Sequence, residues 1–163
     1  MAVIVAAVAI LVIIGSVMWL KPSPTQRRQT QMRLLARQLG LDVRLSGLPQ
    51  TRRARVRQER PEQGVVYRWL QFGDNKNGLT RDYVWCRDDV NSAWEIESTE
   101  GLSPALLAKI EAMFTEMPAD ARAVELAPHG PGIYWMERGG EEAVRGVQQM
   151  LHRLQQLLLE ERF

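Results

Sequence analysis

The chain has 163 residues, a formal net charge of +2 and a single cysteine. One thiol cannot form an internal disulfide, so the composition excludes a disulfide-stapled secreted domain and agrees with a reducing compartment. About 140 residues follow an apolar N-terminal stretch, without repeats or low-complexity tracts, which is enough for one compact domain with its own core.

The first predicted element is an uncharged stretch that runs from Met1 to Leu20. As a helix, Ala2 to Leu20 would reach about 28 Å, close to the hydrocarbon thickness of a bilayer. Trp19 lies where an interfacial aromatic belongs, and Lys21 follows at once. We interpret residues 1–20 as a transmembrane anchor. The alternatives are a cleaved signal peptide, whose basic start is missing here, and a buried core helix.

The charges after this stretch predict its orientation. Five cations precede the first acid, Asp42, and the positive-inside rule then places the N-terminus outside and the following body in the cytoplasm. Residues 21–60 hold eleven Lys/Arg and two acids, whereas residues 61–163 hold ten Lys/Arg and seventeen acids. Basic residues close to a bilayer are typical of contact with anionic lipid, and the acidic remainder argues against nucleic acid. The alternative is that the arginines are only solvated.

We therefore predict one set of basic residues as membrane-surface or partner contacts. The set consists of Lys21, Arg27, Arg28, Arg33, Arg37, Arg53, Arg55 and Arg57.

The next predicted element is a basic juxtamembrane linker and helix, residues 21–40. A helix over Gln26 to Leu39 would be capped by Thr25 and ended by Gly40. Its narrow apolar stripe fits either a helix lying on the bilayer or a helix docked on the domain. We favour docking, with the arginine face turned to lipid.

Alternating side chains predict several strands after this helix, at Leu41–Leu48, Arg52–Glu59 and Val65–Phe72. The segment from Gly73 to Gly78 predicts a hairpin loop, so Leu79–Arg87 would be the strand that returns beside Val65–Phe72.

Two of the predicted strands carry charges on one face. In Arg52–Glu59 the arginines alternate with Ala54 and Val56, and in Ala93–Glu97 the glutamates alternate with Trp94 and Ile96. If both strands belong to one antiparallel sheet, Glu95 and Glu97 would lie beside the ladder of arginines and partly neutralise it. The alternative is that the two strands are distant and both charged faces are solvated.

The sequence of the C-terminal half predicts two helices, with a β-hairpin between them along the chain. Ser103-Pro104 begins a helix that runs to about Met117, and strands at Arg122–Leu126 and Ile133–Glu137 flank a turn. The last helix, Glu141 to Glu160, has apolar residues at heptad a, d and g positions. This wide stripe favours packing on the sheet, with a homodimer through this helix as the alternative.

No recognised chemical motif occurs along the chain. There is no Gly-rich phosphate loop, no Cys/His cluster with metal-ligand spacing and no nucleophile with a matched base. His129 and His152 lack partners at such spacings, and Cys86 follows a strand pattern that indicates an inert thiol. We therefore predict no catalytic, cofactor-binding or metal-binding residues, no cofactor, and a protein that is not an enzyme.

One resemblance to a known family lies near the N-terminus. An apolar span, then Lys21-Pro22-Ser23-Pro24-Thr25-Gln26-Arg27-Arg28, then a helix, resembles the start of YajC, the small accessory subunit of the bacterial preprotein translocase. It also resembles uncharacterised single-pass inner-membrane proteins of Gram-negative bacteria. The family's Gly-Asp-x-Val signature is not present at Leu41-Asp42-Val43, which lacks the glycine. The resemblance implies a place in the bacterial inner membrane, beside a membrane complex.

We expect an α+β protein with an N-terminal transmembrane helix, followed by a mainly antiparallel sheet with about three helices packed on it. The expected parts are the anchor (1–20), the basic linker and helix (21–40) and a cytoplasmic α+β domain (41–163). Its expected function is that of an accessory or adaptor subunit, with the lipid bilayer, including anionic lipid, and a membrane protein as partners. The alternatives are a lipid-binding peripheral module tethered by its span, and an enzyme with an unrecognised site.

Overall fold

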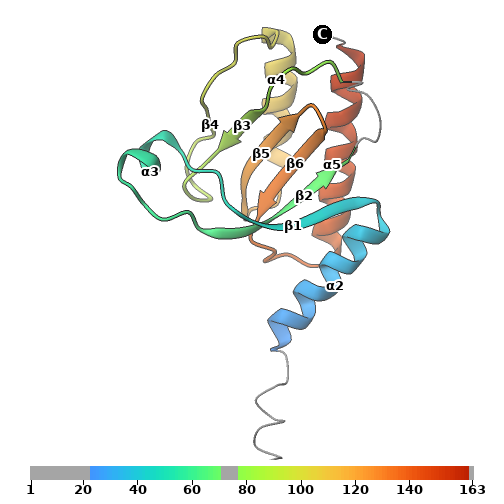
Figure 1. Cartoon of the computed structure of the whole chain (residues 1–163). Coiled ribbons are helices and arrows are strands. Elements are labelled where there is room, and N and C mark those ends of the chain that lie inside the picture. Colours follow the sequence, from blue (N-terminus) through green and yellow to red (C-terminus); the bar gives the residue numbers. More distant parts are fainter. Residues whose placement is uncertain (1–22, 71–76, 162–163) are drawn as a thin grey trace, which may run out of the picture. The chain divides into compact units, whose positions relative to one another are not determined.

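A computed structural model describes residues 23–70 and 77–161 of the chain (Figure 1). The predicted transmembrane anchor and Lys21 lie outside these residues. Among the helices of the described part, none has the length and apolar character that crossing a bilayer requires. The chain divides into a short N-terminal unit that ends at Thr30 and a larger unit that begins at Gln31 and contains the sheet.

The larger unit is built on a six-stranded sheet with the order β1-β2-β6-β5-β3-β4. Every neighbouring pair is antiparallel, so the predicted α+β class with an antiparallel sheet is confirmed. The strands are β1 (Leu41–Gly47), β2 (Gln63–Trp69), β3 (Tyr83–Cys86), β4 (Glu95–Ile96), β5 (Ala121–Ala127) and β6 (Gly130–Trp135).

Four α-helices occur in the described residues. They are α2 (Pro24–Gln38), α3 (Arg52–Val56), α4 (Pro104–Ala112), which the short 3-10 helix η1 (Met113–Glu116) continues, and α5 (Glu141–Glu160). Side chains of α4, of α5 and of the second half of α2 form the main core with one face of the sheet. About three packed helices were expected, and α3 is a fourth that does not belong to this core.

The main core confirms most of the predicted inward faces. Fully buried aromatic rings of Tyr67, Trp85 and Trp135 come from three strands, and Tyr67 and Trp135 meet edge to face with centroids 5.1 Å apart. The predicted stripe of the last helix lies in this core, so its packing on the sheet is confirmed, while a homodimer stays a prediction. The buried stripe consists of Val144, Val147, Met150, Leu151, Leu154 and Leu158.

The opposite face of the sheet, which we call the second face, carries a smaller apolar cluster. Its buried members are Leu48, Val66, Cys86, Ala123 and Tyr134. The side chains of β3 alternate between the two faces as predicted: Tyr83 and Trp85 belong to the main core, whereas Val84 and Cys86 belong to the second face. The segment from Leu48 to α3 borders this face, and it positions the candidate site.

The prediction of a strand at Arg52–Glu59 is wrong, because this segment forms helix α3. The Oγ1 atom of Thr51 accepts a hydrogen bond from the Ala54 amide (3.2 Å) and caps the helix. Arginine and alanine favour helices. The alternation that indicated a strand does not match the observed burial, because Val56, which was expected to point inward, is 77% exposed.

The predicted hairpin between β2 and β3 is also wrong. Strand β2 lies between β1 and β6, whereas β3 lies between β5 and β4. Residues 71–76 of the expected loop lie outside the described residues. Beyond them, Asn77 is buried and donates from Nδ2 to the carbonyl oxygen of Ala127 (2.9 Å), which fixes the chain at the end of β5 rather than beside β2.

The residue that caps the N-terminus of α2 differs from the predicted one. Ser23, not Thr25, caps the helix: its Oγ accepts from the Gln26 amide (3.2 Å), and the Gln26 side chain accepts from the Ser23 amide (2.9 Å). This reciprocal pair is a capping box, and Pro24 then takes the first helical position, which suits its fixed φ. Gly40 ends the helix with φ +83°, as expected.

Candidate functional site

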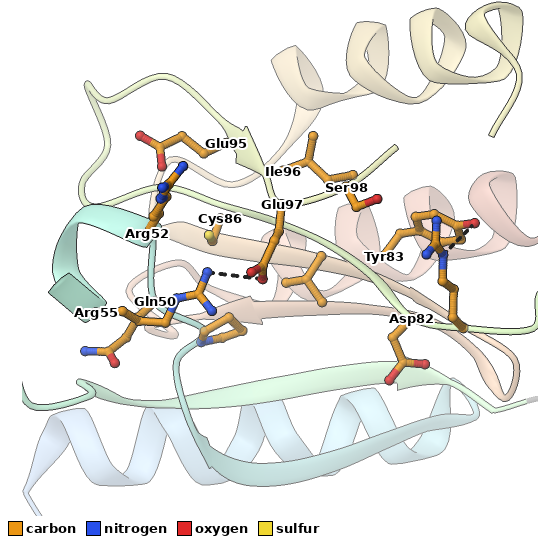
Figure 2. A pocket seen from close by; sticks show the side chains of 13 residues that line it. Gln50, Arg52, Arg55, Asp82, Tyr83, Cys86, Glu95, Ile96, Glu97 and Ser98 are labelled. Atoms are coloured by element: carbon orange, nitrogen blue, oxygen red, sulfur yellow. Dashed lines mark hydrogen bonds and ion pairs between the residues drawn. The ribbon is translucent and has the colours of Figure 1, made fainter. Parts of the chain in front are cut away.

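A groove of about 870 Å³ opens between the α3 segment and the edge formed by β3 and β4 (Figure 2). We call it the α3 groove. Val84 and Cys86 of β3 line it, together with Arg52 and Arg55 of α3 and with Glu95 and Glu97 at β4. Polar and charged residues therefore provide much of its surface.

Local backbone geometry places opposite charges on the two sides of the groove. Arg52 and Arg55 are three residues apart on a helix, so they share a side of α3. Glu95 and Glu97 are two residues apart at a strand, so they share a face, while the Ile96 between them packs against the main core. Arginines of α3 thus face glutamates at β4 and directly after it.

One of these contacts is an ion pair that joins the two sides. Nη2 of Arg55 lies 3.1 Å from Oε2 of Glu97, and Arg52 and Glu95 point toward each other in Figure 2. The predicted ladder of arginines along a strand is wrong, since these residues are helical. Arg55 and Glu97 are nevertheless neighbours, and Arg55 reaches Glu97 from a helix rather than from a strand.

Few contacts hold the α3 segment against the sheet. Leu48 and Ala54 are buried, and Oγ1 of Thr51 donates a hydrogen bond to Oδ1 of Asp88, just after β3. Nε2 of Gln50 donates to the carbonyl oxygen of Glu59 (2.7 Å) and closes the segment on itself. The groove therefore has one side that is attached mainly by polar contacts.

Cys86 is the only thiol of the chain, and its side chain is nearly buried. Burial, followed by the negative charge of Glu95, raises the pKa of the Cys86 thiol to about 11. The thiolate is the reactive form of cysteine, so the group stays protonated at neutral pH and the position supports the interpretation of an inert thiol.

A polar network lies elsewhere on the second face. Nη2 of Arg68 donates to Oε2 of Glu125 (2.7 Å), and the hydroxyl of Tyr134 donates to the same oxygen (2.9 Å). Burial and then the charge of Glu125 raise the pKa of Tyr134 to about 12. Gly132 leaves room for this network, because a Cβ there would lie 3.0 Å from Cγ of Arg68. The sequence did not reveal it, since its members come from three different strands.

A second network joins α2 to the sheet. Nε of Arg33 lies 2.9 Å from Oε1 of Glu137, and the hydroxyl of Tyr67 donates to the same oxygen, also at 2.9 Å. Glu137 is 1% exposed. Burial and the negative charge of Glu137 raise the pKa of Tyr67, and the hydrogen bond to Glu137 raises the pKa of Arg33. Arg33, predicted as a lipid or partner contact, forms this ion pair within the larger unit while its side chain stays 30% exposed, and the predicted contact remains a prediction.

The other predicted contact residues are scattered. Arg27 and Arg28 are exposed in the N-terminal unit, and Arg37 is exposed at the end of α2. Arg57 lies 3.6 Å from Glu59, and Arg53 is exposed without an ion pair among the described residues. The structure thus brings Arg53, Arg55 and Arg57 together on α3 or directly after it, and only Arg55 faces the groove.

The described residues contain no group of three His, Cys, Asp or Glu side chains arranged to hold a metal ion. His152, which has no ligand partner in the sequence pattern, lies beside Trp69 with ring centroids 5.1 Å apart and ring planes tilted by 58°. No protein-family model, no curated protein and no solved structure matches this chain.

Proposed function

We propose that the chain is a membrane-anchored adaptor. Its N-terminal stretch would hold it in the bacterial inner membrane with the N-terminus outside, and its cytoplasmic domain would bind a short segment of a membrane-protein partner in the α3 groove. The observation that carries this proposal is the lining of the groove, where arginines of α3 face Glu95 of β4 and Glu97 directly after it, beside Val84 and Cys86.

The lining supports a polypeptide ligand more than a small molecule. Small-molecule sites place only a few polar groups in an apolar lining, whereas this groove carries several charged side chains of both signs. Complementary charges across an interface contribute specificity and register more than affinity. A partner segment with an acidic residue for Arg52 and a basic residue for Glu95 fits this surface.

The groove is able to exchange its own ion pair for contacts with a partner. Arg55 and Glu97 have side chains that are 47% and 75% exposed, and such surface pairs contribute only about 0–1 kcal/mol. Breaking this pair therefore costs little. The buried carboxylates of Glu125 and Glu137 are hydrogen-bonded to arginine and tyrosine, which supports a structural role for them and a binding role for the domain.

Site-specific photocrosslinking in native membranes tests this proposal. A photoreactive residue at Gln50 or Ser98, both lining the groove, should give one adduct of the same discrete mass, and the same residue at exposed Arg145 on α5 should not. The charge reversal Glu95→Lys should remove the adduct, while Glu142→Lys on α5 should leave it unchanged. Equal adducts from all three positions, or an adduct that survives Glu95→Lys, would show that the groove is not the binding site.

A further inference from the structure

The tip of α3 presents an apolar side chain among arginines. Val56 is 77% exposed, the highest value among the exposed large hydrophobic residues of the described part. It lines a shallow open depression of about 470 Å³ together with Arg52, Arg53, Arg57 and Glu95. We call Arg53, Val56 and Arg57, which do not line the α3 groove, the α3 tip.

Helical spacing separates the α3 tip from the residues that hold the helix. Ala54 is buried and Arg55 pairs with Glu97, so this side of α3 is occupied within the domain. Val56 lies three residues after Arg53, the spacing of neighbours on a helix surface, and Arg57 follows directly after Val56. The contacts that fix α3 therefore leave the α3 tip available.

The charge around the α3 tip is strongly positive. Residues 52–60 contain five arginines and one glutamate. Arg53 has no ion pair among the described residues, and the pair between Arg57 and Glu59 is long, at 3.6 Å. A solvent-exposed valine beside the unpaired guanidinium of Arg53 and the weakly paired one of Arg57 is an arrangement that an anionic interface stabilises, because the apolar group leaves water while the cations reach the anions.

We propose that the α3 tip docks on anionic lipid headgroups, with Val56 entering the interface and Arg53 and Arg57 contacting phosphates. Guanidinium groups match phosphate oxygens in a bidentate geometry, so arginine suits this contact better than lysine would. The inference rests on the membrane anchoring in the proposed function, because a tether keeps the domain at a high effective concentration near the bilayer. Arg55 is not part of this surface, since it is paired at the groove.

Fluorescence of the full chain in lipid nanodiscs tests the inference. Val56→Cys in a Cys86→Ser background carries an environment-sensitive dye, and the discs contain phosphatidylcholine alone or with phosphatidylglycerol. We expect a blue shift only in the anionic discs, and its reversal at high salt, because salt screens exposed charges. The same dye at Arg145→Cys on α5 is the control and should not respond. The double variant Arg53→Gln, Arg57→Gln should lose the shift, whereas Arg145→Gln should keep it.

Each other outcome overturns the inference in a distinguishable way. A chain that enters the anionic discs but shows no shift at position 56 does not use the α3 tip on lipid, although the anchoring stands. A shift that inorganic phosphate produces in neutral discs identifies a phosphate site, and a shift that an acidic peptide produces there identifies a protein surface. A chain that does not enter the discs at all removes the anchoring, and the lipid contact with it.

Discussion

Glu137 keeps a carboxylate almost out of contact with water, directly after the last strand of the sheet. Its backbone has φ +54°, a conformation that residues other than glycine rarely adopt, and its side chain accepts hydrogen bonds from Arg33 and Tyr67. A buried charge is tolerated only when such partners replace the lost solvent. Three segments far apart in the sequence therefore meet at one carboxylate.

The variant Glu137→Gln keeps the shape of this side chain but removes its charge. We expect a loss of about 2 kcal/mol in the free energy of unfolding, because the Arg33 guanidinium, which is 30% exposed, loses a charged acceptor. Urea unfolding of the full chain in detergent micelles, followed by tryptophan fluorescence, measures this change. Glu142→Gln, at an exposed position of α5, is the matched control and should change little; equal stability of the two variants would contradict the role of Glu137.

Single elements were predicted correctly where the apolar pattern was long and incorrectly where it was short. The last helix was predicted with its observed bounds, because twenty residues carry one continuous apolar stripe that the sheet buries. Helix α3 was mistaken for a strand, because five residues with one buried side chain carry too little periodicity to separate the two structures. The sequence feature that does indicate a helix here is local, because Thr51 is positioned to cap it.

Pairing between strands was predictable only where the connection is short. The β5–β6 hairpin followed from a turn of a few residues, whereas the false β2–β3 hairpin shows that a loop sequence does not reveal which strands become neighbours. The α3 groove was partly foreseeable, since alternation placed Glu95 and Glu97 on one face. Their approach to Arg55 depends on tertiary contacts more than thirty residues apart in sequence, which no local pattern contains.

The cap of α3 gives a prediction about this element alone. Thr51→Ala removes the hydroxyl that caps α3 and also donates to Asp88, so we expect the segment to loosen by about 1–2 kcal/mol. Limited trypsin digestion measures this loosening, because the segment is rich in arginine, and cleavage between residues 52 and 60 should accelerate several-fold. Thr51→Ser retains the hydroxyl and should be cut at the parent rate. Equal cleavage of both variants would show that the cap does not hold α3.

At the scale of the whole molecule, the charge distribution along the chain predicts one topology. A phosphatase that is active only after export, fused to the C-terminus, should stay inactive, because the cations after the apolar stretch predict a cytoplasmic domain by the positive-inside rule. A fluorescent protein that folds only in the cytoplasm, fused at the same position, should be bright. High phosphatase activity in the first fusion would reverse the proposed orientation and place the α3 groove on the other side of the membrane.

The position of β6 in the sheet has a consequence for biosynthesis. This strand pairs with β2 on one side and with β5 on the other, yet it is the last strand to leave the ribosome. The pair β1–β2 and the group of β3, β4 and β5 can each begin to order earlier, but they share no ladder until residues 130–135 have been made. Non-local pairing of this kind is slow and leaves apolar surface exposed while it is incomplete. We therefore expect the nascent domain to expose apolar surface until β6 has left the ribosome, and a chain truncated before residue 130 would lack the strand that joins the two parts of the sheet.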